Sequence, residues 1–223
     1  MPPTSRHGVL ILPDAILPEA KKRVVRPRHA ASLIIFRQSH TGTEMLMGMR
    51  GSKHRFMPNI LVFPGGRVDR GDHRAPFATP LRADTRALLE RKALPQLAQS
   101  LALAAARELE EETGLSLAAA PGAAPELDGL HYLCRAVTPP HMHMRFNARF
   151  LVVEAERVSG NLAGSGELES LRYIGIDDAL AHDLAGITRD VVLNLGEFLR
   201  LSTDQRAART QVPINHRNIW RME

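Results

Sequence analysis

Four glutamates lie within five consecutive positions of the segment 104–115, AAARELEEETGL. The alanines and leucines before them and the glycine at position 114 predict a helix that ends just beyond these glutamates. At about 100° per residue, Glu108, Glu111 and Glu112 share one face of this helix, and the fourth glutamate points away. Carboxylates this close repel one another unless a cation lies between them, and hard oxygen ligands suit Mg²⁺ or Mn²⁺. The pattern therefore indicates a divalent metal site, with a solvated acidic helix face as the alternative.

A glycine turn precedes this helix in the segment 63–72, FPGGRVDRGD. Paired glycines let the backbone approach a ligand closely and leave a carbonyl oxygen free to coordinate a cation. Two further carboxylates, Asp69 and Asp72, follow the turn. Arg107, four residues before Glu111, can pair with that glutamate and hold its side chain in place.

Together, the turn and the helix resemble the Nudix box, G-x5-E-x7-R-E-U-x-E-E-x-G-U, where U is an apolar residue. The matching positions are Gly66, Arg107, Glu108, Leu109, Glu111, Glu112, Gly114 and Leu115. The sequence departs from the pattern at two points. Asp72 stands where the family has glutamate, and 34 residues instead of seven separate Asp72 from Arg107. A helical insertion at this point is similar to one Nudix branch, which includes animal coenzyme A diphosphatases.

The predicted elements favour an α/β fold with a mixed sheet. Segments 30–36 and 44–50 have the apolar patterns of strands, and a helix is expected from Pro95 to Thr113. Strands and helices mix without regular alternation, which favours one sandwich over a doubly wound fold. The resemblance implies a Nudix-type α/β/α sandwich.

The whole chain, residues 1–223, is interpreted as a single Nudix domain with a core of about 30–200 and a helical insertion at 73–99. We expect the insertion to form a helical lobe beside the site. Its predicted apolar stripe consists of Leu81, Leu88, Leu89 and Leu94.

The resemblance implies a role for each residue of the metal site. Glu108 and Glu112 would bind the metal, with Glu111 as a third ligand and the Gly65 carbonyl as a backbone ligand. Arg107 would orient the glutamates and would not touch the substrate.

A general base is expected outside the box, on the segment 164–180, GSGELESLRYIGIDDAL. This segment resembles a family loop that supplies a base, which makes Glu167 the favoured general base or extra metal ligand and Glu169 the second choice. The alternative interpretation is that either glutamate is an ordinary residue of a solvated loop. The candidate catalytic residues are therefore Glu111, Glu167 and Arg107.

Substrate-binding candidates lie upstream, in the segment 46–66, LMGMRGSKHRFMPNILVFPGG. This segment resembles the extra motif of coenzyme A diphosphatases and makes Arg50, Arg55 and Gly66 candidate substrate-binding residues. Two guanidinium groups suit an additional phosphate, such as the 3′-phosphate of coenzyme A. The alternative is that both arginines are ordinary surface residues.

The resemblance therefore implies a metal-dependent diphosphatase that hydrolyses a nucleoside diphosphate linked to another group, with coenzyme A or acyl-coenzyme A as the first choice. ADP-ribose, a dinucleotide or a nucleotide sugar are the alternative substrates. An alternative of another class is a Nudix-fold regulator that binds nucleotide or RNA without hydrolysis. All three box glutamates are present, which favours the enzyme.

The cysteine count, the apolar segments and the charge distribution indicate in which cellular compartment the protein works. The single cysteine, Cys134, excludes an internal disulfide framework and is typical of a reducing cytoplasm. No membrane-spanning apolar run is present. The net charge of +5 is concentrated in residues 1–30 and 205–223, which we interpret as solvated basic ends and not as a nucleic-acid surface. We expect a cytoplasmic protein with a nucleotide-type small-molecule substrate; family members often pair, which leaves a homodimer open.

Overall fold

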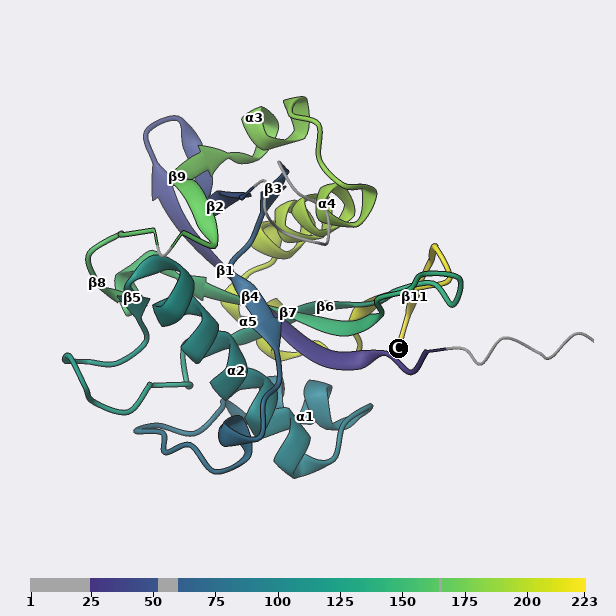
Figure 1. The fold of residues 1–223 in the computed structure, drawn as a ribbon, viewed down its shortest axis with the longest axis horizontal. Helices are drawn as coiled ribbons and strands as arrows, with labels where there is room; N and C mark the ends of the chain where they lie inside the picture. Colours follow the sequence, from purple (N-terminus) through teal and green to yellow (C-terminus); the bar gives the residue numbers. More distant parts are fainter. Residues whose placement is uncertain (1–24, 52–59, 165) are drawn as a thin grey trace, which may run out of the picture.

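A mixed β-sheet lies between two layers of helices (Figure 1). The structure is a computed structural model that describes residues 25–51, 60–164 and 166–223. Along the sheet the strand order is β11-β10-β6-β7-β1-β2-β3, with β4 paired to β1 and β9 paired to β2. The pairs β1–β7 and β6–β10 are parallel and the other pairs are antiparallel. The predicted mixed α/β class is confirmed.

The strands of this sheet have the following bounds: β1 Arg28–Ser39, β2 Gly42–Arg50, β3 Leu61–Val62, β4 Gly65–Arg67, β6 His131–Val137, β7 Phe146–Glu154, β9 Leu168–Gly175, β10 Pro213–His216 and β11 Ile219–Met222. A separate short pair joins β5, Leu115–Ser116, to β8, Ser159–Gly160. Three-residue 3₁₀ turns, η1 at Gly71–His73 and η2 at Ala155–Arg157, complete the irregular parts.

Apolar side chains of β1 point alternately to the two faces of the sheet and contribute to an apolar core on each face. Leu33 and Ile35 pack into one apolar cluster with helices α1, Ala83–Glu90, and α2, Pro95–Thr113. The intervening Ile34 and Phe36 pack into a second cluster on the opposite face of the sheet. Because strand side chains alternate between faces, one buried strand supplies both cores.

Three further helices follow β9: α3 at Ile176–Ala181, α4 at Gly186–Arg200 and α5 at Thr203–Ala207. Helices α3 and α4 cover the second core. The chain before α5 forms a capping box, in which the Ser202 hydroxyl accepts from the Gln205 amide and the Gln205 side chain accepts from the Ser202 amide.

Helix α2 has the predicted bounds. Pro95 occupies its first turn, where the missing N–H has no partner to lose. Gly114 ends it at a positive φ of 71°, which glycine adopts without steric penalty. Small buried residues such as Ala102 and Ala105 bring the helix close to β1, so the glutamates at its end lie beside the sheet.

The segment 73–99 is ordered, but it is not one lobe. Its first residue, His73, ends η1, and α1 follows further along. Its last five residues, 95–99, form the start of α2. Leu81, Leu88 and Leu89 are buried as predicted, whereas Leu94 is 78% exposed. Helix α1 ends at Glu90, and Leu94 is the extended N-cap of α2, so the helical periodicity of the stripe stops before it.

Hydrogen bonds attach the insertion to the loop between β5 and β6. The Thr79 hydroxyl donates to the Asp128 carboxylate at 2.8 Å, and the Thr85 hydroxyl donates to the Leu130 carbonyl at 2.8 Å. These contacts hold α1 against the body of the fold on the α2 side of the sheet.

The C-terminal residues belong to the sheet, which corrects the interpretation of residues 205–223 as a solvated tail and the core limit near residue 200. Strand β10 pairs with β6, and β11 pairs with β10. The Arg209 guanidinium donates to the carbonyls of Tyr132 and Leu133 at 2.9 and 3.1 Å, so this arginine supports backbone instead of facing solvent. None of the helices in the described residues has the length and apolar character needed to cross a membrane.

Candidate active site

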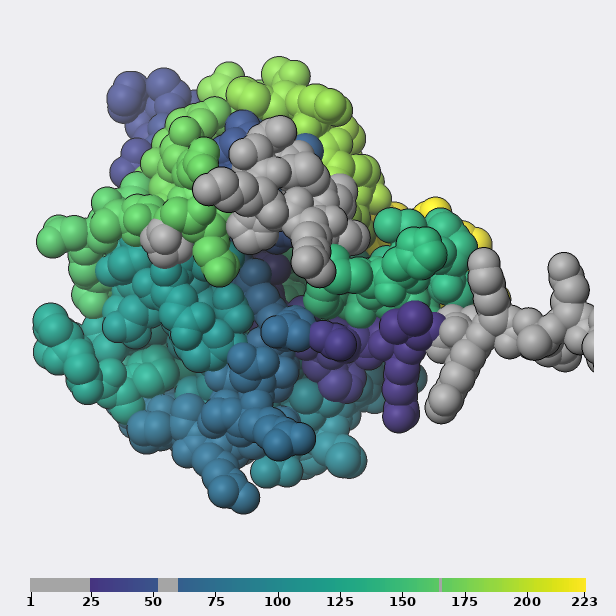
Figure 2. All heavy atoms as spheres, in the orientation of Figure 1, coloured from purple at the N-terminus to yellow at the C-terminus, as the bar shows by residue number. Residues whose placement is uncertain are grey.

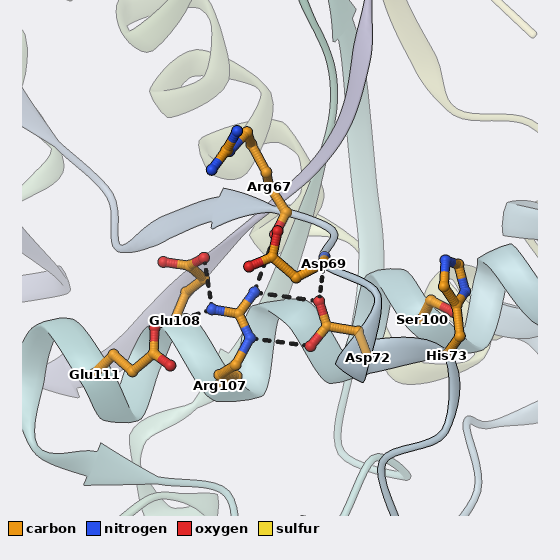
Figure 3. Close-up of polar contacts among 8 residues, drawn as sticks. All are labelled: Arg67, Asp69, Asp72, His73, Ser100, Arg107, Glu108 and Glu111. Atoms are coloured by element: carbon orange, nitrogen blue, oxygen red, sulfur yellow. Dashed lines mark hydrogen bonds and ion pairs between the residues drawn. The ribbon is translucent and has the colours of Figure 1, made fainter. Parts of the chain in front are cut away.

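Arg107 is the centre of the polar cluster at the end of α2 (Figure 3). Its Nε donates to Asp72 Oδ1 at 3.0 Å, and its Nη1 donates to Glu108 at 2.8 Å and Glu111 at 2.9 Å. Its Nη2 donates to the Arg67 carbonyl at 3.0 Å and to Asp72 Oδ2 at 3.2 Å. All five guanidinium N–H groups are therefore used within the protein. The hydrogen bond to Asp72 does most to raise the pKa of Arg107 above its ordinary value. Burial opposes this shift, and the hydrogen bond to Glu108 adds to it.

Asp72 forms the other half of a two-point ion pair with Arg107. Its side chain is 3% exposed, and its Oδ2 also accepts from the Asp69 amide at 2.7 Å. Asp72 lies within η1, after which the chain forms the insertion and returns through α2. Beside this pair, the His73 ring and the Ser100 hydroxyl share a hydrogen bond at 2.7 Å, which ties η1 to α2.

The two glycines of β4 lie directly against the glutamates. A Cβ on Gly66 would collide with the Glu108 carboxylate, and one on Gly65 would collide with the backbone of β1. Gly65 also has a φ of 154°, a region that residues with side chains rarely adopt. The Gly65 amide donates to Glu112 Oε2 at 2.8 Å, so the turn and the helix are joined at this point.

Burial shifts the protonation of the two glutamates that face the turn. Glu112 is 6% exposed, and this burial, with the nearby charges of Glu108 and Glu167, raises its pKa to about 7. The Gly65 amide and Arg50 act in the opposite direction. Burial also raises the pKa of Glu108, although Arg107 opposes the shift. Carboxylates that resist ionisation in this way are stabilised by a bound cation.

The carboxylate oxygens of Glu108 and Glu112 are the kind of ligand atom that a hard cation such as Mg²⁺ prefers. Glu108 Oε1 is held by Arg107 and Glu112 Oε2 by the Gly65 amide. Among the residues that the structure describes, the second oxygen of each carboxylate accepts no hydrogen bond, so each glutamate has one fixed and one open oxygen. In the same part of the chain, no three His, Cys, Asp or Glu side chains converge as a finished metal site.

The other candidate residues lie around this centre. Glu167 and Arg50 line the same cleft, and both influence the pKa of Glu112. The side chain of Glu111 is 57% exposed and lies at the rim, paired with Arg107. Glu169 stands on β9 opposite Met49. Arg55 lies outside the described residues.

The cleft is much longer than the glutamate cluster. Its volume is about 1140 Å³, and it extends from β4 across the sheet to the β6–β7 hairpin and the start of α4. Figure 2 shows the hairpin, in green, beside the first residues of β1, in purple, and the Arg28 amide donates to the Arg145 carbonyl at 2.9 Å there. The sequence patterns do not predict this far end, because β10 reaches it only through long-range strand pairing.

Comparison with solved structures identifies the fold. A NUDIX hydrolase from Alicyclobacillus acidocaldarius superposes with a TM-score of 0.61 and 24% identity, over 75% of this chain and 90% of that chain. A MutT NUDIX hydrolase from Burkholderia pseudomallei gives a TM-score of 0.49 and 21% identity, over 77% of this chain and 99% of that chain. The fold of this chain is that of the Nudix hydrolase structures.

At the level of sequence, a Caenorhabditis elegans protein named as a nudix hydrolase is 35% identical over 88 residues, which is 40% of this chain. The match spans only 22% of the length of that curated relative. No family model matches the chain.

Proposed function

We propose that this protein is a metal-dependent Nudix diphosphatase that hydrolyses a nucleoside diphosphate linked to another group. The observation that carries the proposal is the pair Glu108 and Glu112 beside a glycine turn. Each has one oxygen fixed by the protein and a second oxygen that accepts no hydrogen bond from the described residues. The fold and the local sequence match support the same assignment.

Metal binding is assigned to residues of α2 and β4. Glu108 and Glu112 would hold Mg²⁺ or Mn²⁺, with Glu111 and the Gly65 carbonyl as further ligands. When bound, such an ion neutralises diphosphate charge and makes water a better nucleophile. Gly66 leaves room for the Glu108 carboxylate to lie against the turn, because an added Cβ would occupy the same place.

The protein's own groups then divide the remaining work. Arg107 is a positioning residue, because its five donors are used on Asp72, the glutamates and a backbone carbonyl. Glu167 lines the cleft near both ligand glutamates and would accept the proton of the attacking water. A water oxygen bonds to phosphorus, the bridging P–O bond breaks, and the bridging oxygen leaves with one phosphate group.

For the substrate, coenzyme A or acyl-coenzyme A is our first choice, and ADP-ribose, a dinucleotide or a nucleotide sugar are the alternatives. Arg50 supports a phosphate-rich substrate, because it lines the cleft and lowers the pKa of Glu112. This position suits the diphosphate as well as an additional phosphate. Arg55 keeps its proposed role from the sequence resemblance alone.

A product-resolved substrate panel with Mg²⁺ and with Mn²⁺ tests the proposal. Wild type is expected to release two phosphate-bearing products from at least one diphosphate-linked nucleotide. Coenzyme A is compared with its 3′-dephospho form on wild type and Arg50→Ala. If the additional phosphate is read, wild type prefers coenzyme A and Arg50→Ala loses that preference mainly through KM. Equal use of both forms by wild type would reject coenzyme A as the assigned substrate, and no hydrolysis of any member would reject the enzyme.

A further inference from the structure

A row of residues crosses the floor of the cleft from the glycine turn to the far edge of the sheet. In the strand register, Asn215 lies opposite Ala136, Ala136 opposite Ala148, Ala148 opposite Ala30, and Ala30 opposite Arg67. Residues directly opposite one another in a sheet project to the same face. All five line the cleft, so the alanines form a floor that joins its two ends.

Asn215 is the unusual member of this row. It is 7% exposed and it lines the cleft. Among the described residues, no hydrogen bond reaches its side-chain amide. An asparagine side chain offers two donors and one acceptor. Most of the residue is buried, but its amide is open to the cleft, so a ligand bound there can replace water as its hydrogen-bond partner.

The surroundings of Asn215 favour a flat ligand. Three methyl groups in one row make a level apolar surface, and Ile187 at the start of α4 adds apolar lining. Trp220 lies opposite Asn215 on β11, and its Nε1 donates to the Asp190 carboxylate at 2.8 Å. Trp220 is the only tryptophan of the chain, so it reports on this end of the cleft.

The distance along the floor also limits the ligand. Adjacent strands lie about 4.8 Å apart, so three steps from β10 to β1 cover roughly 14 Å. Side chains at both ends shorten the gap that a ligand must bridge. A group held at Asn215 is therefore one arm of a molecule whose other end reaches the glutamates.

We propose that Asn215 binds the hydrogen-bonding edge of a nucleobase whose ring lies on the alanine floor and whose diphosphate reaches the glutamate cluster. An asparagine amide pairs its donor and its acceptor with adjacent groups on a base edge, as it does in recognising adenine. This inference rests on the proposed diphosphatase function, since it places the nucleoside arm of that substrate. An amide in the linked group has the same hydrogen-bonding chemistry and is the competing occupant.

Binding is measured without hydrolysis, by Trp220 fluorescence and by calorimetry in the presence of Mg²⁺. The probes are ADP, ribose 5-diphosphate, which lacks the base, and pantetheine, which carries amides without a base. The variants are Asn215→Ala and Asn215→Asp, and the control is Asn161→Ala, an exposed asparagine that does not line the cleft. Asn215→Asp keeps the shape and removes the donors, so it remains informative if the alanine variant folds poorly.

We expect ADP to change the fluorescence of wild type and of the control. Both Asn215 variants should bind ADP about tenfold more weakly, the equivalent of one lost hydrogen bond, with unchanged affinity for ribose 5-diphosphate. Equal losses for ADP and ribose 5-diphosphate, or no loss for either, would overturn the inference. Asn215-dependent binding of pantetheine but not of ADP would overturn the nucleobase in favour of the amide.

Hydrolysis of the substrate panel is scored separately, so the two proposals can fail independently. Asn215-dependent ADP binding without hydrolysis of any substrate supports the base site and rejects the diphosphatase. Hydrolysis that is unaffected by both Asn215 variants keeps the diphosphatase and rejects the base site.

Discussion

Arg107 connects the insertion, the glycine turn and the ligand glutamates through one side chain. Helical spacing predicts its pairing with Glu111, four residues further along the chain. Neither this spacing nor the family resemblance predicts that Asp72 contacts Arg107. In the sequence 34 residues separate Asp72 from Arg107, and the family residue at the position of Asp72 is a glutamate, which is one methylene longer. Only the folded chain shows that the shorter carboxylate still meets Arg107 at two points.

We predict that Asp72→Asn lowers kcat by about 10- to 100-fold, because a charged two-point contact that positions Arg107 is weakened. Affinity for the metal should fall as well, since Arg107 also fixes Glu108. The measurements are steady-state kinetics and metal titration, with the exposed Asp177→Asn on α3 as the matched control. Unchanged kcat and unchanged metal affinity in a folded Asp72→Asn would contradict the positioning role.

Gly66→Ala should reduce activity far more than stability. The added methyl would meet the end of the flexible Glu108 side chain, which can move away, so the fold persists while the ligand geometry changes. Activity is compared with the free energy of unfolding for Gly66→Ala and for Gly71→Ala, where an added Cβ meets nothing. Full activity of Gly66→Ala would show that Glu108 does not need its present position.

The raised pKa of Glu112 should make the stability of the metal-free protein depend on pH. Its pKa is about 7 in the folded state and near 4.5 in the unfolded chain, so the folded state binds the proton more tightly. This contribution to stability is complete below pH 4.5 and disappears as pH rises to about 7, a loss of about 3 kcal/mol at most.

The corresponding test is urea unfolding of metal-free wild type and Glu112→Gln between pH 5 and pH 8, a range chosen to include the raised pKa of about 7. The Gln variant should be the more stable protein at the upper end, and Mg²⁺ should stabilise wild type only. Parallel stability curves for the two proteins would show that the Glu112 carboxylate ionises normally.

At the scale of elements, helix α2 was predictable because Pro95 and Gly114 mark its ends by their own backbone chemistry. The insertion was less predictable. Its leucines have helical spacing, but a break between two helices changes which of them face the core. Leu94 falls in that break and faces solvent.

The different burial of Leu89 and Leu94 predicts different effects of their substitution on stability. Leu89→Ala should lower the free energy of unfolding by about 2–4 kcal/mol, because its side chain is 2% exposed and a cavity would remain. Leu94→Ala should change it by less than about 0.5 kcal/mol, as is usual for exposed positions. Chemical denaturation of both variants is the measurement, and similar losses would contradict the packing of α1.

At the scale of the whole molecule, the two-faced core was predictable and the extent of the sheet was not. Apolar alternation in β1 depends on neighbours in sequence, whereas β10 and β11 depend on pairing with β6 across a long stretch of chain. The charge of the last segment suggested a solvated end. Its apolar residues Val212 and Ile214 are in fact buried. For the same reason, no local sequence pattern marks Asn215 as part of the cleft.

The central claim is that the glutamates of α2 that face the glycine turn perform the chemistry, and one comparison of kcat tests it most directly. Glu112→Gln removes the buried carboxylate, and Glu110→Gln removes an exposed carboxylate of the same helix that points away from the turn. On the best substrate at saturating Mg²⁺, Glu112→Gln should lose about 30- to 1000-fold in kcat, the scale of a lost electrostatic contact of 2–4 kcal/mol. Glu110→Gln should match wild type. Full activity of a folded Glu112→Gln, or an equal loss in both variants, would contradict the account.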